Sequence, residues 1–85
     1  MRYVKLLSGA EYEIYRCGAA EGVLWIGLST LSIAQAAAVF SDPAATREII
    51  SYYDFGMEQQ YFNYMDITYV GLDGQGVLIA LREVK

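Results

Sequence analysis

Few side chains in this sequence are of a kind that could carry out chemistry. It contains no histidine, so an imidazole base, a histidine metal ligand and a Ser-His-Asp triad are excluded. Glu11 and Glu13 are spaced as on one face of a β-strand, and solvation of that face explains both carboxylates. Ser32 stands three residues before Gln35, the spacing of a helix capping box, so we interpret it as a cap and not as a nucleophile.

Two further features could hold a reactive group or an ion. Cys17 is the single cysteine, which excludes an intramolecular disulfide, and no histidine is present to activate its thiol. We interpret it as a small buried apolar side chain, with a reactive thiol as the alternative. The segment Asp73-Gly74-Gln75-Gly76 is superficially like a calcium loop, but the other acidic ligands and the closing glutamate are missing. The sequence therefore predicts no enzyme, no metal site and no cofactor.

The side chain that stands out is tyrosine, of which this chain of 85 residues holds eight. Tyrosine is seldom wholly buried in so small a domain, because its hydroxyl needs a hydrogen-bond partner, and it is enriched at protein–protein interfaces. Two interpretations stay open: cross-strand packing over a small sheet, and a surface for protein contacts. The residues predicted for such a contact surface are Tyr52, Tyr53, Tyr61, Tyr64 and Tyr69.

The composition indicates a dense domain with few charges. Hydrophobic residues make up 55% of the chain and charged residues 19%, against about 25% charged in a typical soluble domain. A small domain is mostly surface, so we expect apolar area to stay exposed and to favour self-association or a protein partner. The length predicts a single domain over residues 1–85.

Charge and hydropathy argue against two other classes of partner. The net charge is -4 and the six basic residues are scattered, so no cationic face for nucleic acid is predicted. The longest apolar run, Ala36–Phe40, is far shorter than the ~20 residues that span a bilayer. Lys5 and the acidic residues after it argue against a signal peptide. We therefore expect no nucleic acid and no membrane, and a cytoplasmic or virion-associated location.

The first 28 residues predict a meander of three antiparallel strands. They are expected at Arg2–Leu7, Glu11–Cys17 and Val23–Leu28, with turn-forming residues between them. The third strand is apolar on both faces, as in the centre of a sheet, and Trp25 is expected in the core. Gly27 in the same strand predicts a bulge or a close backbone approach.

One helix is predicted after this meander. Apolar residues from Ile33 to Phe40 follow the spacing of one helical face, and Asp42-Pro43 ends the helix. Residues 44–53 are ambiguous, because Asp42 with Pro43 can also start a second helix, whereas the β-branched and aromatic residues favour a strand. We choose the strand, and the helix stays the alternative.

The last third of the chain predicts two more strands and a hairpin. Residues 54–56 turn the chain into a long strand, Gln59–Val70, and Asp73-Gly74 is a two-residue hairpin signal before Val77–Val84. The fold class is therefore α+β and mostly β, with an antiparallel β-β-β-α-β-β-β order forming a curled sheet or a small, partly open barrel with one short helix. Alternation along the long strand places one set of side chains on a common face: Tyr61, Asn63, Met65, Ile67 and Tyr69.

Four features form a familiar outline: YEIYRCGAAEGVLWIGL, a helix closing on Phe40 before Asp42-Pro43, a tyrosine-rich strand, and the terminal DGQGVLIALREV. In this outline the chain resembles small uncharacterised proteins encoded in prophages of Gram-positive bacteria, near tail, baseplate or lysis functions. It departs from their pattern where Phe55 interrupts an Asp-Gly turn, and where Asn63-Tyr64-Met65 replaces a Gly-Tyr-Thr-like step. The resemblance implies a structural or accessory phage protein acting through protein–protein contacts, and it transfers no catalytic residue.

These observations lead to one main hypothesis and two alternatives. The main hypothesis is a non-enzymatic structural or accessory protein that self-associates or binds a protein partner. The strand Glu48–Tyr53 or the C-terminal strand is expected to offer an edge for pairing with another chain. The first alternative is a monomeric regulatory or inhibitory protein that binds one host protein, where the acidic balance would suit a basic partner. The more distant alternative is a small-molecule binder that uses the inside of a small barrel.

Overall fold

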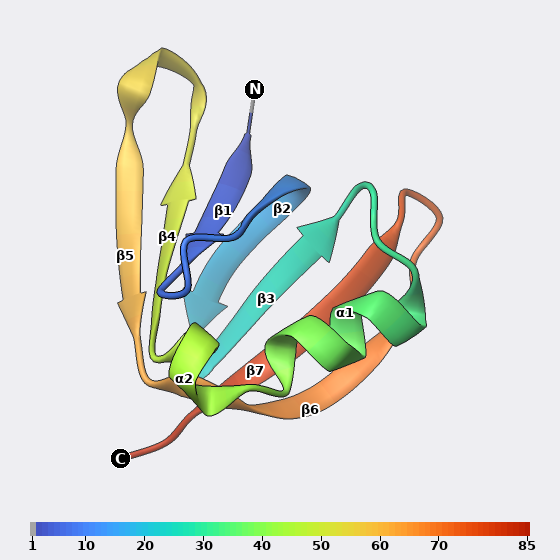
Figure 1. Cartoon of the computed structure of the whole chain (residues 1–85). Coiled ribbons are helices and arrows are strands. Elements are labelled where there is room, and N and C mark those ends of the chain that lie inside the picture. Colours follow the sequence, from blue (N-terminus) through green and yellow to red (C-terminus); the bar gives the residue numbers. More distant parts are fainter. Residues whose placement is uncertain (1) are drawn as a thin grey trace.

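A computed structural model describes residues 2–85, and strands make up most of it (Figure 1). The strands, in chain order, are β1 (Tyr3–Leu6), β2 (Glu11–Ala20), β3 (Val23–Leu28), β4 (Glu48–Tyr52), β5 (Glu58–Phe62), β6 (Tyr64–Leu72) and β7 (Val77–Glu83). The helical elements are α1 (Ile33–Phe40), α2 (Pro43–Thr46) and a 3-10 turn, η1 (Asp54–Gly56). The predicted α+β class, mostly β, is confirmed.

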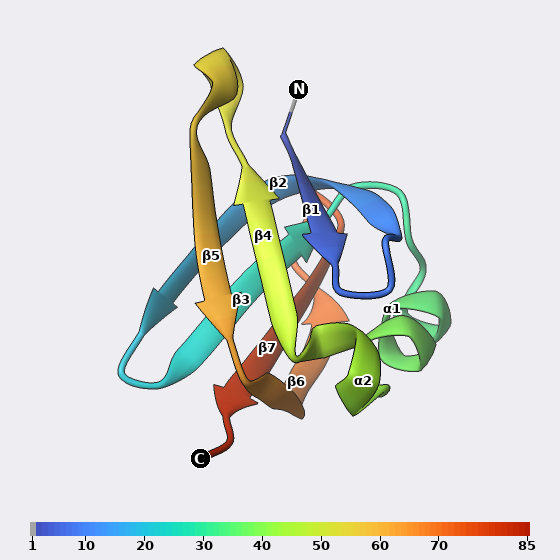
Figure 2. The same cartoon turned by 60° about the vertical axis from the view of Figure 1, so that its left-hand side comes forward.

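All seven strands belong to one antiparallel sheet in the order β5-β4-β1-β2-β3-β7-β6. The first three strands form the predicted meander. The sheet curls strongly (Figures 1 and 2) but does not close, because its two edge strands, β5 and β6, are not paired with each other. Of the two architectures that the sequence left open, the curled sheet is the one observed.

Neither strand that was expected to offer an edge lies at an edge of the sheet. β4, which covers the predicted strand Glu48–Tyr53, lies between β5 and β1, and the C-terminal strand β7 lies between β3 and β6. Both strands are paired on both sides, so that prediction is wrong. The edges are β5 and β6, which the alternating pattern had merged into a single predicted strand, Gln59–Val70.

Asn63 divides that predicted strand and carries the chain from one edge of the sheet to the other. Its φ of 65° lies in the left-handed region, which asparagine tolerates better than most residues. Its N–H donates to the Arg47 carbonyl and its carbonyl accepts from the Val84 N–H, both at 2.8 Å. Two register shifts in β6 disturb the alternation further. The prediction that residues 61, 63, 65, 67 and 69 lie on one common face is therefore wrong.

Local signals explain where α1 begins and which face it buries. Ser32 and Gln35 form the predicted capping box, in which the Gln35 N–H donates to Ser32 Oγ at 3.1 Å and the Ser32 N–H donates to Gln35 Oε1 at 2.9 Å. The helix buries Ala36 and Phe40, and the Phe40 ring lies 6.4 Å from the ring of Tyr12 on β2. α1 therefore covers part of the inner face of the sheet.

The ambiguous segment 44–53 is divided between a helix and a strand. The Ala44 N–H donates to Asp42 Oδ1 at 3.0 Å, which starts the single turn of α2 with Pro43 at its beginning. The helix that was the alternative prediction for this segment is thus present as α2. The strand that we chose is present from the start of β4.

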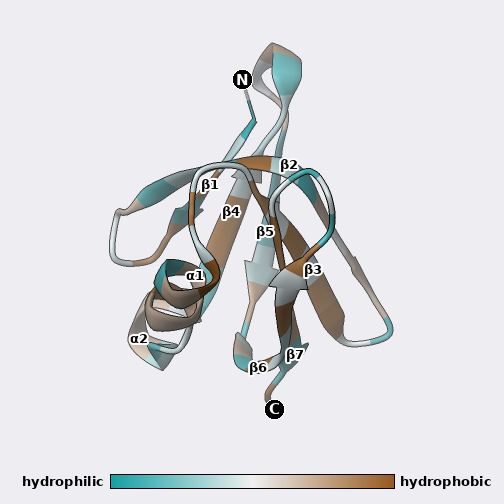
Figure 3. Cartoon of the chain, turned by 90° about the vertical axis from the view of Figure 1, so that its right-hand side faces the viewer, coloured by the Kyte–Doolittle hydropathy of each residue, from teal (hydrophilic) through white to brown (hydrophobic). Residues whose placement is uncertain are grey.

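The core lies between the inner face of the sheet and the helices, and Figure 3 shows hydrophobic residues running along β3. On this strand Leu24, Ile26 and Leu28 are fully buried. Because alternate residues of a strand point to opposite faces, Trp25 points to the outer face, where its ring lies 5.9 Å from that of Tyr69. The expectation that Trp25 lies in the core is wrong.

On the outer face, the ring of Tyr15 packs over β3. A Cβ added to Gly27 would lie 2.5 Å from this ring, so a side chain comes close to Gly27 where a bulge or a close backbone approach was predicted. The Tyr15 hydroxyl is shielded from solvent and has no hydrogen-bond partner of standard geometry among the described residues, although it faces the Asp73 carboxylate. Burial first, and then this carboxylate, raise the pKa of Tyr15 to about 12, and the same contact lowers the pKa of Asp73.

The predicted hairpin between β6 and β7 is confirmed, but its loop is longer than expected. Leu72 pairs with Val77, so the loop has the four residues Asp73–Gly76 in place of two. The Asp73 N–H donates to the Gly76 carbonyl at 3.2 Å, and the Gln75 N–H donates to Asp73 Oδ1 at the same distance. These two bonds stabilise the turn of the loop.

Candidate functional site

The hairpin made by β4 and β5 is the part of the chain that stands out from the sheet. Its strands pair in regular register from Glu48↔Phe62 to Tyr52↔Glu58. One more hydrogen bond, from the Tyr53 N–H to the Met57 carbonyl at 2.8 Å, closes the ladder below the η1 turn. Figures 1 and 2 show this tip projecting past the neighbouring strands. The tip of the hairpin therefore lies away from the rest of the sheet.

Phe55 occupies the centre of this tip and is fully exposed, with a relative accessibility of 101% for the whole residue. Its φ is 67°, a left-handed conformation that is unusual for a bulky residue. That conformation costs about 1–2 kcal/mol for a residue with a Cβ, and an unburied Phe forgoes roughly 1.5–3 kcal/mol of burial. Met57 beside it is 64% exposed. The tip thus exposes two large apolar side chains, one of them on a strained backbone.

Contacts with β1 hold the base of the hairpin. The rings of Tyr3 and Tyr52 stack with their centroids 4.6 Å apart and their planes 17° apart, on residues that are paired across β1 and β4. Arg2 Nε lies 3.9 Å from Asp54 Oδ2, at the start of the η1 turn. These contacts with β1 therefore hold the base of the hairpin in place beneath the tip.

Three of the five tyrosines predicted for a contact surface face the interior. Tyr61 is only 8% exposed, and its hydroxyl lies 3.4 Å from the hydroxyl of Tyr53. The Tyr64 ring meets the Tyr61 ring edge-on, with centroids 6.1 Å apart. These three side chains pack against one another, which is the cross-strand interpretation that the sequence left open.

The other two predicted tyrosines lie on the outer face but on different parts of the sheet. Tyr52 is half-buried in its stack with Tyr3 on β1. Tyr69, on the opposite edge strand, is 45% exposed and packs against Trp25. The five tyrosines therefore do not form one continuous surface. Sequence reasoning missed Phe55 and Met57, although a phenylalanine placed between Asp and Gly in a turn was a visible signal.

A small polar cluster lies beneath β5 in the concave interior. Ser51 is fully buried, and its Oγ donates to the Gln59 carbonyl at 3.5 Å. Burial raises the pKa of the nearby Cys17 thiol to about 11, against the lowering effect of hydrogen bonds with Ser51 and Tyr61. The Tyr61 pKa is also raised, by burial and then by the Tyr53 hydroxyl. A raised pKa keeps the thiol protonated at neutral pH, the form that is the weaker nucleophile.

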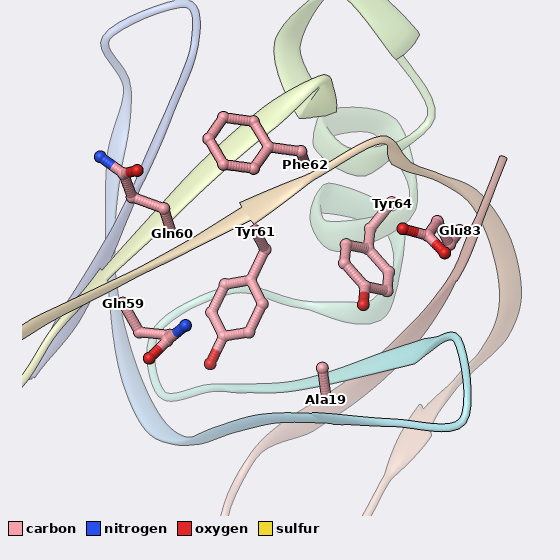
Figure 4. Close-up of a pocket in the computed structure, with 7 residues that line it drawn as sticks. All are labelled: Ala19, Gln59, Gln60, Tyr61, Phe62, Tyr64 and Glu83. Atoms are coloured by element: carbon pink, nitrogen blue, oxygen red, sulfur yellow. The ribbon is translucent and has the colours of Figure 1, made fainter. Parts of the chain in front are cut away.

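A groove of about 470 Å³ runs beside β5 (Figure 4). Tyr61 and Tyr64 point into it toward Ala19, whereas Phe62 lies on the other side of its strand. The lining residues are Ala19, Gln59, Gln60, Tyr61, Phe62, Tyr64 and Glu83. Because four consecutive residues of β5 contribute, the groove follows the edge of this strand and not one of its faces.

Comparisons with known proteins give no match: no protein-family model, no curated protein and no solved structure matches the chain. Within residues 2–85, no group of three or more His, Cys, Asp or Glu side chains is placed to hold a metal ion. No helix in the same range is long and apolar enough to cross a membrane. The exposed Phe55 and Met57 and the groove beside β5 make the β4–β5 hairpin the candidate site.

Proposed function

We propose that this chain is a small, non-enzymatic structural or accessory protein that acts through protein–protein contacts, including contacts between its own copies. The observation that carries the proposal is Phe55, a fully exposed aromatic residue held in a left-handed conformation at the end of a projecting hairpin. The resemblance to prophage-encoded proteins adds a phage or prophage origin to the proposal, with a cytoplasmic or virion-associated location.

The tip has the properties of an anchor for a protein partner. Aromatic side chains that enter a pocket of the partner dominate the binding energy of many interfaces. Met57 adds a flexible apolar side chain that adapts to irregular surfaces. The hairpin ladder and the stacked tyrosines at its base fix the tip before binding, so little conformational entropy is lost when a partner is bound.

A photoreactive phenylalanine analogue in place of Phe55 tests this proposal in the cells that naturally produce the protein. We expect irradiation to give a discrete covalent adduct with one protein, which mass spectrometry identifies. The same analogue at Gln75, an exposed residue of the β6–β7 loop, is the matched control and should give no such adduct. The absence of any adduct from position 55, or identical adducts from both positions, would contradict the proposal. A single host enzyme as the adduct would favour the regulatory or inhibitory alternative.

A further inference from the structure

We propose that the free edge of β5 pairs with β5 of a second copy of this chain, antiparallel and centred on Gln60, so that two sheets join into one. This inference rests on the proposed function, because it names a second copy of the chain as one of the proteins that the chain contacts. It concerns the backbone edge of the hairpin, whereas the proposed function is carried by the apolar tip. The two can therefore fail separately.

The hydrogen-bond pattern of the hairpin defines which backbone groups of β5 are available. The Tyr53 N–H donates to the Met57 carbonyl and the Asn63 N–H donates to the Arg47 carbonyl, so residues 57 and 63 face β4. In an antiparallel pair this role alternates along the strand, and the β4–β5 register is regular throughout. Residues 59 and 61 therefore also bond to β4. The N–H and C=O groups of residues 58, 60 and 62 point to the free edge.

The two edges of this sheet are protected very differently. β6 carries two register shifts, and α1 and α2 pack against it. Bulges and covering helices are devices by which proteins prevent edge-to-edge pairing. The β5 sequence EQQYF contains no lysine, no proline and no bulge, and its one charged residue, Glu58, stands at the start of the strand. β5 is the edge that remains able to accept another strand.

The spacing of the available groups fits pairing of β5 with itself. A two-fold axis through Gln60 sets Glu58 opposite the partner copy's residue 62 and Gln60 opposite its own counterpart. All three outward-facing residues then fall in hydrogen-bonded pairs, as an antiparallel ladder requires. No like charges are placed directly opposite each other, because the acidic end of one strand meets the aromatic end of the other. The groove along the same edge leaves room for the added strand.

The symmetry makes residue 60 a specific test position. Gln60→Lys and Gln60→Glu each place two like charges opposite each other across the axis, and we expect each to weaken dimerisation at least about tenfold. An equal mixture of the two variants places Lys opposite Glu and should restore a mixed dimer. The same substitutions at the exposed Gln75 are the matched controls and should leave the dimer unchanged. Circular dichroism of each variant checks that the fold is retained.

Light scattering after size exclusion gives the readout, from about 10 μM to about 1 mM, the range in which small interfaces associate. The wild-type chain of 9.5 kDa should approach twice that mass as its concentration rises. A chain that stays monomeric throughout, or a dimer that survives both Gln60 substitutions, would overturn the inference. A monomeric chain that still gives the adduct from position 55 would leave the proposed contact with another protein standing, while the contacts between copies fall.

Discussion

Replacement of Phe55 by glycine should separate the stability of this protein from its ability to bind. In the free chain Phe55 has a φ of 67° and a fully exposed ring. Glycine adopts this backbone conformation without the penalty of about 1–2 kcal/mol that a Cβ brings, and no buried apolar contact is lost. The greater freedom of glycine in the unfolded chain offsets about 0.5–1 kcal/mol of this gain.

We therefore expect Phe55→Gly to raise the free energy of unfolding by about 0.5–1 kcal/mol, a rise in Tm of about 2–8 °C for a domain of this size. Urea and thermal unfolding followed by circular dichroism measure both quantities. Phe55→Ala is the control: it keeps a Cβ on the left-handed backbone and removes only the exposed ring. Its stability should stay within about 0.5 kcal/mol of the wild type.

Both variants should lose binding to the partner that is captured through position 55, since both remove the ring. A loss of more than about 1 kcal/mol of stability in both would refute the reasoning, because the ring would then be packed in the folded protein. Unchanged partner binding in both would show that the ring is not the anchor, whatever happens to stability.

Three further predictions concern the fold. The β2–β3 turn has Glu21 at a φ of 55° and Gly22 at a φ of 78°, values that favour the sequence Asn-Gly. Glu21→Asn should therefore raise the free energy of unfolding, measured by urea titration, by about 0.5–1 kcal/mol. A lower free energy of unfolding would contradict this assignment of the turn. Gly76→Ala would push a Cβ into the Leu28 carbonyl oxygen and should lower the free energy of unfolding by about 1–3 kcal/mol, whereas an unchanged urea midpoint would show that the loop moves aside. The Cys17 thiol has a pKa raised from 9.0 to about 11, so the stability linked to its neutral form is present below pH 9 and lost as pH rises through 11. Between pH 9 and pH 11 the free energy of unfolding should fall by about 2 kcal/mol more in the wild type than in Cys17→Ala. Parallel plots of this free energy against pH for the two proteins would contradict the raised pKa.

The parts of the fold that local chemistry determines could be predicted from the sequence. The capping box of Ser32 and Gln35 and the hairpin around Asp73 both depend on residues near one another in the chain. The α+β class followed from these elements and from the alternation of apolar residues, whereas the choice between a curled sheet and a partly open barrel came only from the strand order.

The errors arose where distant parts of the chain decide the outcome. The alternation of residues continues across Asn63, so nothing local reveals that the chain there passes between opposite edges of the sheet. Trp25 was assigned to the core because its strand is apolar on both faces, and the outer position became clear only from the pairing of β3 with β7. The edges themselves depend on strand order, which short-range patterns do not determine.

The same limit applies to the candidate site. Tyrosine abundance indicated a contact surface, but three of the predicted tyrosines pack together inside the sheet. Phe55 was visible in the sequence as an aromatic residue between two turn formers, yet its full exposure depends on how far the hairpin projects. The available edge of β5 follows from strand order and hydrogen-bond register, which no composition or motif contains.

Amide hydrogen exchange along β5 tests most directly the claim that the β4–β5 hairpin is where this protein contacts other molecules. Labelling is carried out in dilute and in concentrated solution, about a hundredfold apart, and read by residue-resolved NMR. The amides of Gln59 and Tyr61, which bond to β4, should be protected in both. The amides of Glu58, Gln60 and Phe62 should exchange rapidly in dilute solution and become protected in concentrated solution. Exchange of these three that does not change with concentration would contradict the pairing of copies through this edge.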